Sequence, residues 1–275
     1  MTGLTWLHLS DWHQRGKDFD RKVVRDALLQ DIRERAQIDS RLAQIEFVVF
    51  SGDLAFSGQK AEYEAAKEHL LDLVLRAANV KPDRLFIVPG NHDLDRDIVT
   101  EMLPPALQQP LTEDQCKVWL TDDKKRRRVL EPFEAFSEFV GAYTGQKPPD
   151  YASIRVWSDI GSKKVALLGL NSAWMCGRNK DAKGEVYDYG YTLVGEPQIY
   201  DALSQIAAAD VRIVVLHHPF NWLTEFDRNR VEERLGRAVH FILYGHQHVP
   251  NGCSLATSAK KCYQAIDTKQ LFALK

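Results

Sequence analysis

The chain has 275 residues, of which 44% are hydrophobic and 27% charged, as in ordinary globular proteins. This composition excludes a disordered or fibrous chain. Lys and Arg total 36 and Asp and Glu total 38, so the net charge of −2 gives no general attraction to nucleic acid or anionic membranes. No apolar run reaches the roughly 18–20 residues of a membrane span. The four cysteines form no CxxC pair and the first ten residues lack the features of a signal peptide, so we expect a cytoplasmic protein with reduced thiols.

Six short runs of mainly aliphatic residues end abruptly at polar turns. Such runs are typical of buried strands in a sheet that is covered on both faces. The predicted strands are 4–9, 46–50, 84–88, 164–170, 211–216 and 239–244. Between them, apolar residues recur about every 3.6 positions and predict helices over 19–37, 60–78 and 196–209. Strands that alternate with helices indicate an α/β fold.

Residues 98–150 interrupt this alternation. The segment is rich in proline up to Pro110, and a helical pattern follows over 130–143. We interpret it as a helical insertion that caps one edge of the sheet, within a single domain that spans 1–275. The tail after Gly252 predicts two short strands. If the natural chain continues beyond Lys275, we expect this domain to be a module of a larger protein or assembly.

Metal-ligand residue types occupy the turns after almost every predicted strand. Because such turns converge at the carboxyl edge of a sheet, we expect these side chains to gather there. Imidazole and carboxylate suit Mn, Fe, Zn or Co, whereas Ca and Mg prefer oxygen ligands almost alone. The candidate ligands include four histidines, two aspartates and one asparagine, too many for one ion and enough for two if a carboxylate bridges. The motifs are Asp11-x-His13, Gly52-Asp53, Gly90-Asn91-His92-Asp93, His217-His218 and Gly245-His246-Gln247-His248.

In this order, over residues 11–248, the motifs resemble those of the calcineurin-like metallophosphoesterase family, namely DxH, GD, GNH(D/E), a later His and GHxH. The resemblance implies a four-layer α/β/β/α sandwich of the metallo-dependent phosphatase type. It also implies a phosphoric ester hydrolase that uses two divalent or trivalent transition metal ions, with manganese as the first expectation and iron, zinc or cobalt as alternatives.

Carried over residue by residue, the resemblance assigns ligands to both ions. The first metal would be held by Asp11, His13 and His248, the second by Asn91, His217 and His246, with Asp53 as the bridge. A hydroxide shared by the two ions would attack a phosphodiester or a phosphomonoester. We choose His217 over His218 as the ligand because the residue directly after the strand is the usual one, which places His218 beside the ligands.

The same resemblance makes His92 a catalytic residue that faces the phosphate and either donates a proton to the leaving oxygen or stabilises the transition-state charge. Asp93 would fix the tautomer of His92 and raise its pKa. Loops near the metal edge supply candidate contacts to the substrate phosphate. These are Arg15, Lys17, Arg178 and His218.

The substrate class stays open at this point. The stretch Gly52 to Gly58 followed by Glu62-Tyr63 resembles the bacterial cyclic-nucleotide phosphodiesterase branch and favours a small phosphodiester or nucleotide. The cationic run Lys124 to Arg128 instead suggests a nuclease that binds DNA or RNA, although a solvated helix face is the simpler interpretation. A protein phosphatase and a non-catalytic binding module of the same fold are further alternatives. A non-catalytic module should lack some of the metal ligands, and we find no ligand motif missing from this sequence.

Overall fold

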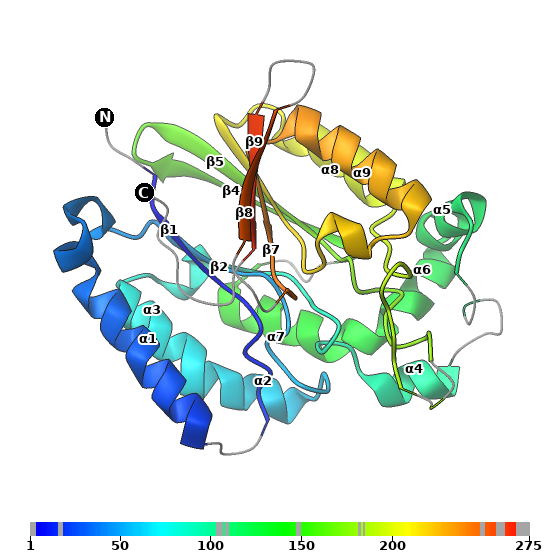
Figure 1. Ribbon diagram of the computed structural model, residues 1–275, viewed down its shortest axis with the longest axis horizontal. Coiled ribbons are helices and arrows are strands. Elements are labelled where there is room, and N and C mark those ends of the chain that lie inside the picture. The colour runs from blue at the N-terminus through cyan, green and yellow to red at the C-terminus, as the bar shows by residue number, and fades with distance from the viewer. Residues whose placement is uncertain are drawn as a thin grey trace.

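The computed structural model describes residues 4–15, 19–102, 107, 110–146, 150–180, 183, 185–247, 251–256 and 262–267. Two β-sheets lie face to face, and helices cover the outer face of each sheet (Figure 1). The α/β class and the four-layer α/β/β/α sandwich that we expected are therefore confirmed.

The first sheet holds three parallel strands, β1 (Trp6–Leu9), β2 (Phe47–Phe50) and β3 (Leu85–Ile87). The second sheet holds, in spatial order, β4 (Ala152–Ile160), β5 (Lys163–Leu170), β6 (Val211–Val215), β7 (Phe241–Tyr244), β9 (Cys262–Asp267) and β8 (Asn251–Ala256). Strands β5, β6, β7 and β9 are parallel, and the antiparallel strands β4 and β8 form the edges. The six predicted strands all form, and so do the two predicted in the tail.

Apolar side chains fill the space between the two sheets. Phe47 of β2 contacts Trp157 of β4 at 5.1 Å between ring centroids. Phe47 and Val49 face this inter-sheet core, whereas Val48 and Phe50 face the helices on the other side. Because successive strand residues point to opposite faces, a strand buried on both faces needs the continuous apolar run that the sequence shows.

Four α-helices cover the outer face of the first sheet. The helix predicted over 60–78 forms as two α-helices joined by a π-helical turn, η2 (Lys67–Leu71). Ile32, Tyr63 and Phe136 are fully buried in this layer. The helices are α1 (Phe19–Ile38), α2 (Lys60–Ala66), α3 (Asp72–Ala78) and α7 (Glu134–Thr144), and the 3-10 turns η1 (Ser40–Leu42) and η3 (Pro82–Arg84) lie between them along the chain.

Two helices, α8 (Glu196–Ile206) and α9 (Glu225–Ala238), cover the outer face of the second sheet. The carboxylate of Asp227, which is buried at the start of α9, accepts hydrogen bonds from the backbone N–H groups of Val194 at 2.7 Å and Gly195 at 3.0 Å. The two helices are therefore joined where α8 begins, close to the edge of the sheet that carries the predicted site.

The segment 98–150 is largely helical where the structure describes it. Leu120 and Val129 pack with Trp174 in a small cluster of their own, whereas α7 belongs to the core of the first sheet. Its elements before α7 are α4 (Arg96–Met102), α5 (Glu113–Thr121), α6 (Asp123–Leu130) and the 3-10 turn η5 (Glu131–Phe133). That the segment is an insertion within one domain over 1–275 stays a prediction. None of the helices in the described ranges is long and apolar enough to cross a membrane.

Candidate metal centre

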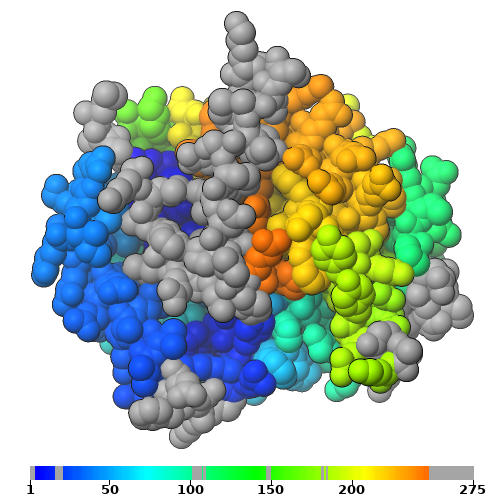
Figure 2. Space-filling model, in the orientation of Figure 1, coloured from blue at the N-terminus to red at the C-terminus, as the bar shows by residue number. Residues whose placement is uncertain are grey.

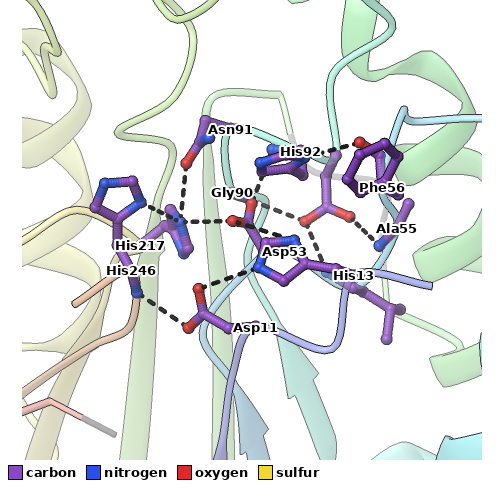
Figure 3. A network of polar contacts seen from close by, with 12 residues as sticks. Asp11, His13, Asp53, Ala55, Phe56, Gly90, Asn91, His92, His217 and His246 are labelled. Carbon is purple, nitrogen blue, oxygen red and sulfur yellow. Dashed lines mark hydrogen bonds and ion pairs between the residues drawn. The ribbon is translucent and has the colours of Figure 1, made fainter. Parts of the chain in front are cut away.

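The turns after five strands bring the predicted ligands that the structure describes to one place between the two sheets (Figure 3). The carboxylate of Asp53 lies at its centre, with His217 and His246 on one side and His13 and His92 on the other. Three groups of ligand atoms each converge within 4.8 Å. These groups are His217, His218 and His246; His13, Asp53 and His92; and Asp11, Asp53 and His217.

His217 contacts several ligand-type atoms of the centre. Its Nε2 lies 3.1 Å from Asn91 Oδ1, 3.1 Å from His246 Nδ1 and 3.3 Å from Asp53 Oδ2. Its other ring nitrogen, Nδ1, donates to the carbonyl of Ser51 at 2.8 Å. This hydrogen bond fixes the ring, so Nε2 is aimed at the point where the other ligand-type atoms meet.

Asp11 provides the test of whether a cation fits here. Its Oδ2 accepts from the backbone N–H of His246 at 3.0 Å, which links the first and last turns of the centre. Its Oδ1 is buried without a hydrogen-bond partner among the described residues, and it lies 3.8 Å from His13 Nε2. An ionised oxygen that is buried in this way is costly unless a positive charge compensates it, so the residues present fit a metal ion.

Four residues of the centre have left-handed backbone conformations that non-glycine residues rarely adopt. The φ angles are 58° at Asp11, 50° at His13, 58° at Asp53 and 70° at His246. Each costs on the order of 1 kcal/mol, and such strain is typical of functional sites. Backbone hydrogen bonds hold the strained turns, among them Asp11 N to Gly52 O at 3.0 Å and His13 N to Asp53 O at 2.9 Å.

Two glycines of the motifs are required by close approach. A Cβ at Gly90 would lie 2.5 Å from the backbone nitrogen of Asp53 and 2.9 Å from its Cγ. A Cβ at Gly52 would lie 2.8 Å from Cγ of His217. Any larger residue would displace a candidate ligand, which explains why glycine precedes both Asp53 and Asn91.

The charges of His217 and Asp53 depend on each other. Burial disfavours the His217 cation, but the Asp53 carboxylate outweighs this effect and raises the pKa of His217 to about 9. Burial likewise disfavours the Asp53 anion, yet His217 outweighs it and holds the pKa of Asp53 well below its usual range. Burial raises the pKa of Asp11. In the metal-free chain, His217 and Asp53 therefore form an ion pair, and a metal that binds His217 Nε2 displaces a proton.

The predicted pairing of Asp93 with His92 is wrong. Asp93 is fully buried, and its carboxylate accepts from the backbone N–H groups of Ala55 and Gly90, both at 2.9 Å. It thus ties the turns after β2 and β3 together, and burial raises its pKa to about 7. The tautomer of His92 is set instead by the carbonyl of Phe56, which accepts from His92 Nδ1 at 2.8 Å.

The remaining sequence candidates lie in different surroundings. His218 is fully buried beside His246, with Nδ1 3.0 Å from Ser172 Oγ, so it supports a ligand and does not face solvent. Arg178 donates through Nη1 to the carbonyls of Trp174 and Cys176 in its own loop. His248 and Lys17 lie outside the described residues.

Arg15 is exposed next to the centre. Its guanidinium carbon lies 4.1 Å from the centroid of the Phe56 ring, and that ring is 5.2 Å from His92. Sequence reasoning missed the contributions of Phe56 and Ser51, because both act through backbone carbonyls that carry no residue-type signal. Their place within three residues of Asp53 is the only sequence feature that could have suggested them.

A four-layer sandwich with Asp, Asn and His side chains gathered at the strand ends defines a metallophosphoesterase-type protein. The chain matches the calcineurin-like phosphoesterase family over residues 4–250, and it belongs to that family. The suspected relationship is therefore confirmed.

Three proteins that the chain resembles share little sequence identity with it. A curated relative, the uncharacterized metallophosphoesterase-like protein YydB of Bacillus subtilis (strain 168), is 24% identical over 249 residues, which cover 88% of this chain and 48% of that protein. A putative 5'-nucleotidase from Staphylococcus aureus is 14% identical, with a TM-score of 0.45 over 96% of this chain and 48% of that one. A dimetal phosphatase from Danio rerio is 14% identical, with a TM-score of 0.47 over 96% of this chain and 86% of that one. The chain spans about half the length of the first two proteins.

Proposed function

We propose that this domain hydrolyses phosphodiester bonds with the help of two transition metal ions, manganese in the first instance and iron, zinc or cobalt as alternatives. The observation that carries the proposal is the place of Asp53, whose carboxylate belongs to two different groups of convergent ligand atoms. When bound, the ions would lower the pKa of water and neutralise the charge of the ester. The proposed ligands are Asp11, His13 and His248 for one ion, Asn91, His217 and His246 for the other, and Asp53 as the bridge.

His92 is the residue that we assign to the leaving group. Because its Nδ1 donates to the Phe56 carbonyl, Nε2 is the atom that can hold the transferable proton. A protonated Nε2 donates to the leaving oxygen as the ester bond breaks, which matters most for leaving groups of high pKa. Asp53 Oδ1 accepts from the backbone N–H of His92 at 2.8 Å and so fixes His92 relative to the proposed bridge.

Arg15 is the cation that we assign to the substrate phosphate. It is exposed, and its position over Phe56 places it on the His92 side of the centre. A guanidinium can donate two hydrogen bonds to the non-bridging oxygens of a phosphate. We take diesters as the first substrate class and monoesters as the second.

Hydrolysis assays with added manganese test this proposal. The purified chain is assayed with bis(p-nitrophenyl) phosphate, p-nitrophenyl phosphate and single-stranded DNA, and its bound metal is measured. We expect diester hydrolysis that disappears with a chelator and in Asp53→Asn, but not in the control Asp26→Asn, an exposed carboxylate on α1. A chain that neither binds metal nor hydrolyses any of the three would instead be a non-catalytic module.

A nuclease stays the second candidate because the cationic run lies on one helix, α6, with Lys124, Arg127 and Arg128 exposed. Part of its charge is neutralised, since Arg126 pairs with Asp123 at 2.8 Å and Asp150 at 2.9 Å. Steeply salt-dependent binding of single-stranded DNA that weakens in Arg127→Gln would favour this candidate. Weak binding that is insensitive to salt would remove it.

A further inference from the structure

Three aromatic side chains lead outward from the metal centre, and we call them the aromatic arm. The Trp222 ring of the 3-10 turn η6 (Phe220–Trp222) lies 4.0 Å from the His246 ring, with the planes at 80°. Tyr189 contacts Trp222 at 5.3 Å, and Tyr187 lies 6.4 Å from Tyr189. The arm thus begins in contact with a proposed ligand and ends at the surface.

Hydrogen bonds hold the arm in place. The carbonyl of Trp222 accepts from the backbone N–H of Gly190 at 2.9 Å and from the hydroxyl of Thr192 at 2.8 Å. Thr192 in turn accepts from the backbone N–H of Thr224 at 3.0 Å. The loop that carries Tyr189 is therefore joined to the turn that carries Trp222. Because both are already held in place, a ligand that stacks on the arm costs little conformational entropy in the protein.

The outer rings of the arm are open to solvent. Tyr187 is 57% exposed and Tyr189 is 44% exposed, whereas most other large aromatic side chains in the described part of the chain are buried or half-buried. In Figure 2, the yellow-green surface near residues 185–195 lies beside the yellow and orange surfaces of the segments that follow β6 and β7. Exposed rings next to a reaction centre can offer their faces to a flat ligand.

The two sides of the centre differ in a way that matches the two substituents of a diester. His92 and Phe56 lie on one side of Asp53, and His246, from which the arm extends, lies on the other (Figure 3). A phosphate bound at Asp53 with its leaving group towards His92 has three further oxygens, and one of them can carry the second substituent towards the arm. The three rings contact one another in a row and do not close around a single point, so they suit a flat base better than an ammonium group.

We propose that the aromatic arm binds the nucleobase of a nucleotide-type phosphodiester, on the substituent that is not the leaving group. This inference rests on the proposed function. Stacking on aromatic side chains tolerates any base, because every base has a π-face. Tyr189 and Trp222 thus act as specificity-determining residues, and the arm selects nucleotide-type diesters without base-specific hydrogen bonds.

Three substrates with a common leaving group test the proposal. The p-nitrophenyl phosphodiesters of thymidine (5'), choline and ethanol differ only in the second substituent. We expect kcat/KM for the thymidine ester to exceed that for the ethyl ester about 10-fold. In Tyr189→Ala we expect the ratio of the two kcat/KM values to fall to near one, mainly through KM. Tyr189→Phe keeps the aromatic ring and should therefore keep the ratio. The control Tyr200→Ala, a 68% exposed tyrosine on α8, keeps the ratio of the unmodified chain.

The outcomes separate the two proposals. Hydrolysis of all three esters at similar kcat/KM refutes base binding by the arm but leaves the proposed phosphodiesterase activity standing. A preference for the choline ester that Tyr189→Ala abolishes also refutes base binding, and shows that the arm binds an ammonium group instead. If none of the three is hydrolysed, the proposed function fails, and calorimetric binding of thymidine 5'-monophosphate then decides on the arm. A Kd about 10-fold weaker in Tyr189→Ala than in Tyr200→Ala supports it, and equal values refute it.

Discussion

Replacing Gly90 by alanine probes the packing that positions the proposed bridge. The new Cβ would lie 2.5 Å from the backbone nitrogen of Asp53 and 2.9 Å from its Cγ, so either this side chain or the turn must move. Overpacking of this kind costs about 1–3 kcal/mol in the free energy of unfolding. Displacement of a ligand or its support lowers metal affinity about 10–100-fold. We therefore expect Gly90→Ala to lose both stability and metal affinity.

Gly145→Ala is the matched control. Gly145 has φ of 64° at the end of α7, and a Cβ there meets nothing within 4 Å. Alanine in that conformation costs about 1 kcal/mol through backbone strain alone. Urea unfolding in a chelator measures the stability of both variants, and calorimetric titration with manganese measures their metal affinity. The close-packing argument would be refuted if Gly90→Ala bound manganese as tightly as the unmodified chain. It would also be refuted if Gly145→Ala lost as much manganese affinity as Gly90→Ala.

Three further predictions concern the proton donor, the metal and a remote buried acid. His92→Ala should keep its metal content but slow hydrolysis of alkyl diesters about 10²–10⁴-fold, with a much smaller effect on p-nitrophenyl diesters, as kcat/KM on both substrates will show. Manganese at 100 times its Kd should raise the free energy of unfolding by about 2.7 kcal/mol in the unmodified chain and far less in Asp53→Asn, as measured by urea unfolding with and without a chelator. Burial raises the pKa of Asp227 to about 6, so the folded chain holds its proton at pH values where the unfolded chain has lost it. Stability should therefore fall by up to about 3 kcal/mol as the pH rises from about 4 to 6 and then level off, and this fall should shrink in Asp227→Asn when both are unfolded in urea at pH 4.5 and 7.

Strands that are buried on both faces stand out most clearly in the sequence. β2 is apolar at every position, so its run stands out, whereas β4 is an edge strand whose exposed residues include Ser158 and Asp159. Helix α9 was also missed, because charged residues dominate it and only a few positions, among them Val231 and Leu235, are buried apolar ones. Elements with one narrow buried face leave a weak pattern in a single sequence.

Within the site, the sequence located the side chains but not their orientations. Parallel strands that end at one edge bring Asp53 and Asn91 together whatever the details of the turns. The direction of Asp93, by contrast, depends on the turn in which its backbone N–H bonds to the carbonyl of Gly90, and this turn directs the carboxylate inward. The partner of His92 is a backbone carbonyl, which every residue possesses. Residue types alone could not distinguish these arrangements.

The left-handed backbone at Asp11, His13, Asp53 and His246 has an evolutionary consequence. Glycine would relieve the strain at each of these four positions, so a lineage selected only to resist heat would drift towards glycine there. Such a lineage would gain stability and forfeit its ligands one by one. Directed evolution for thermostability should therefore monitor these codons, since changes there would yield robust but inert proteins.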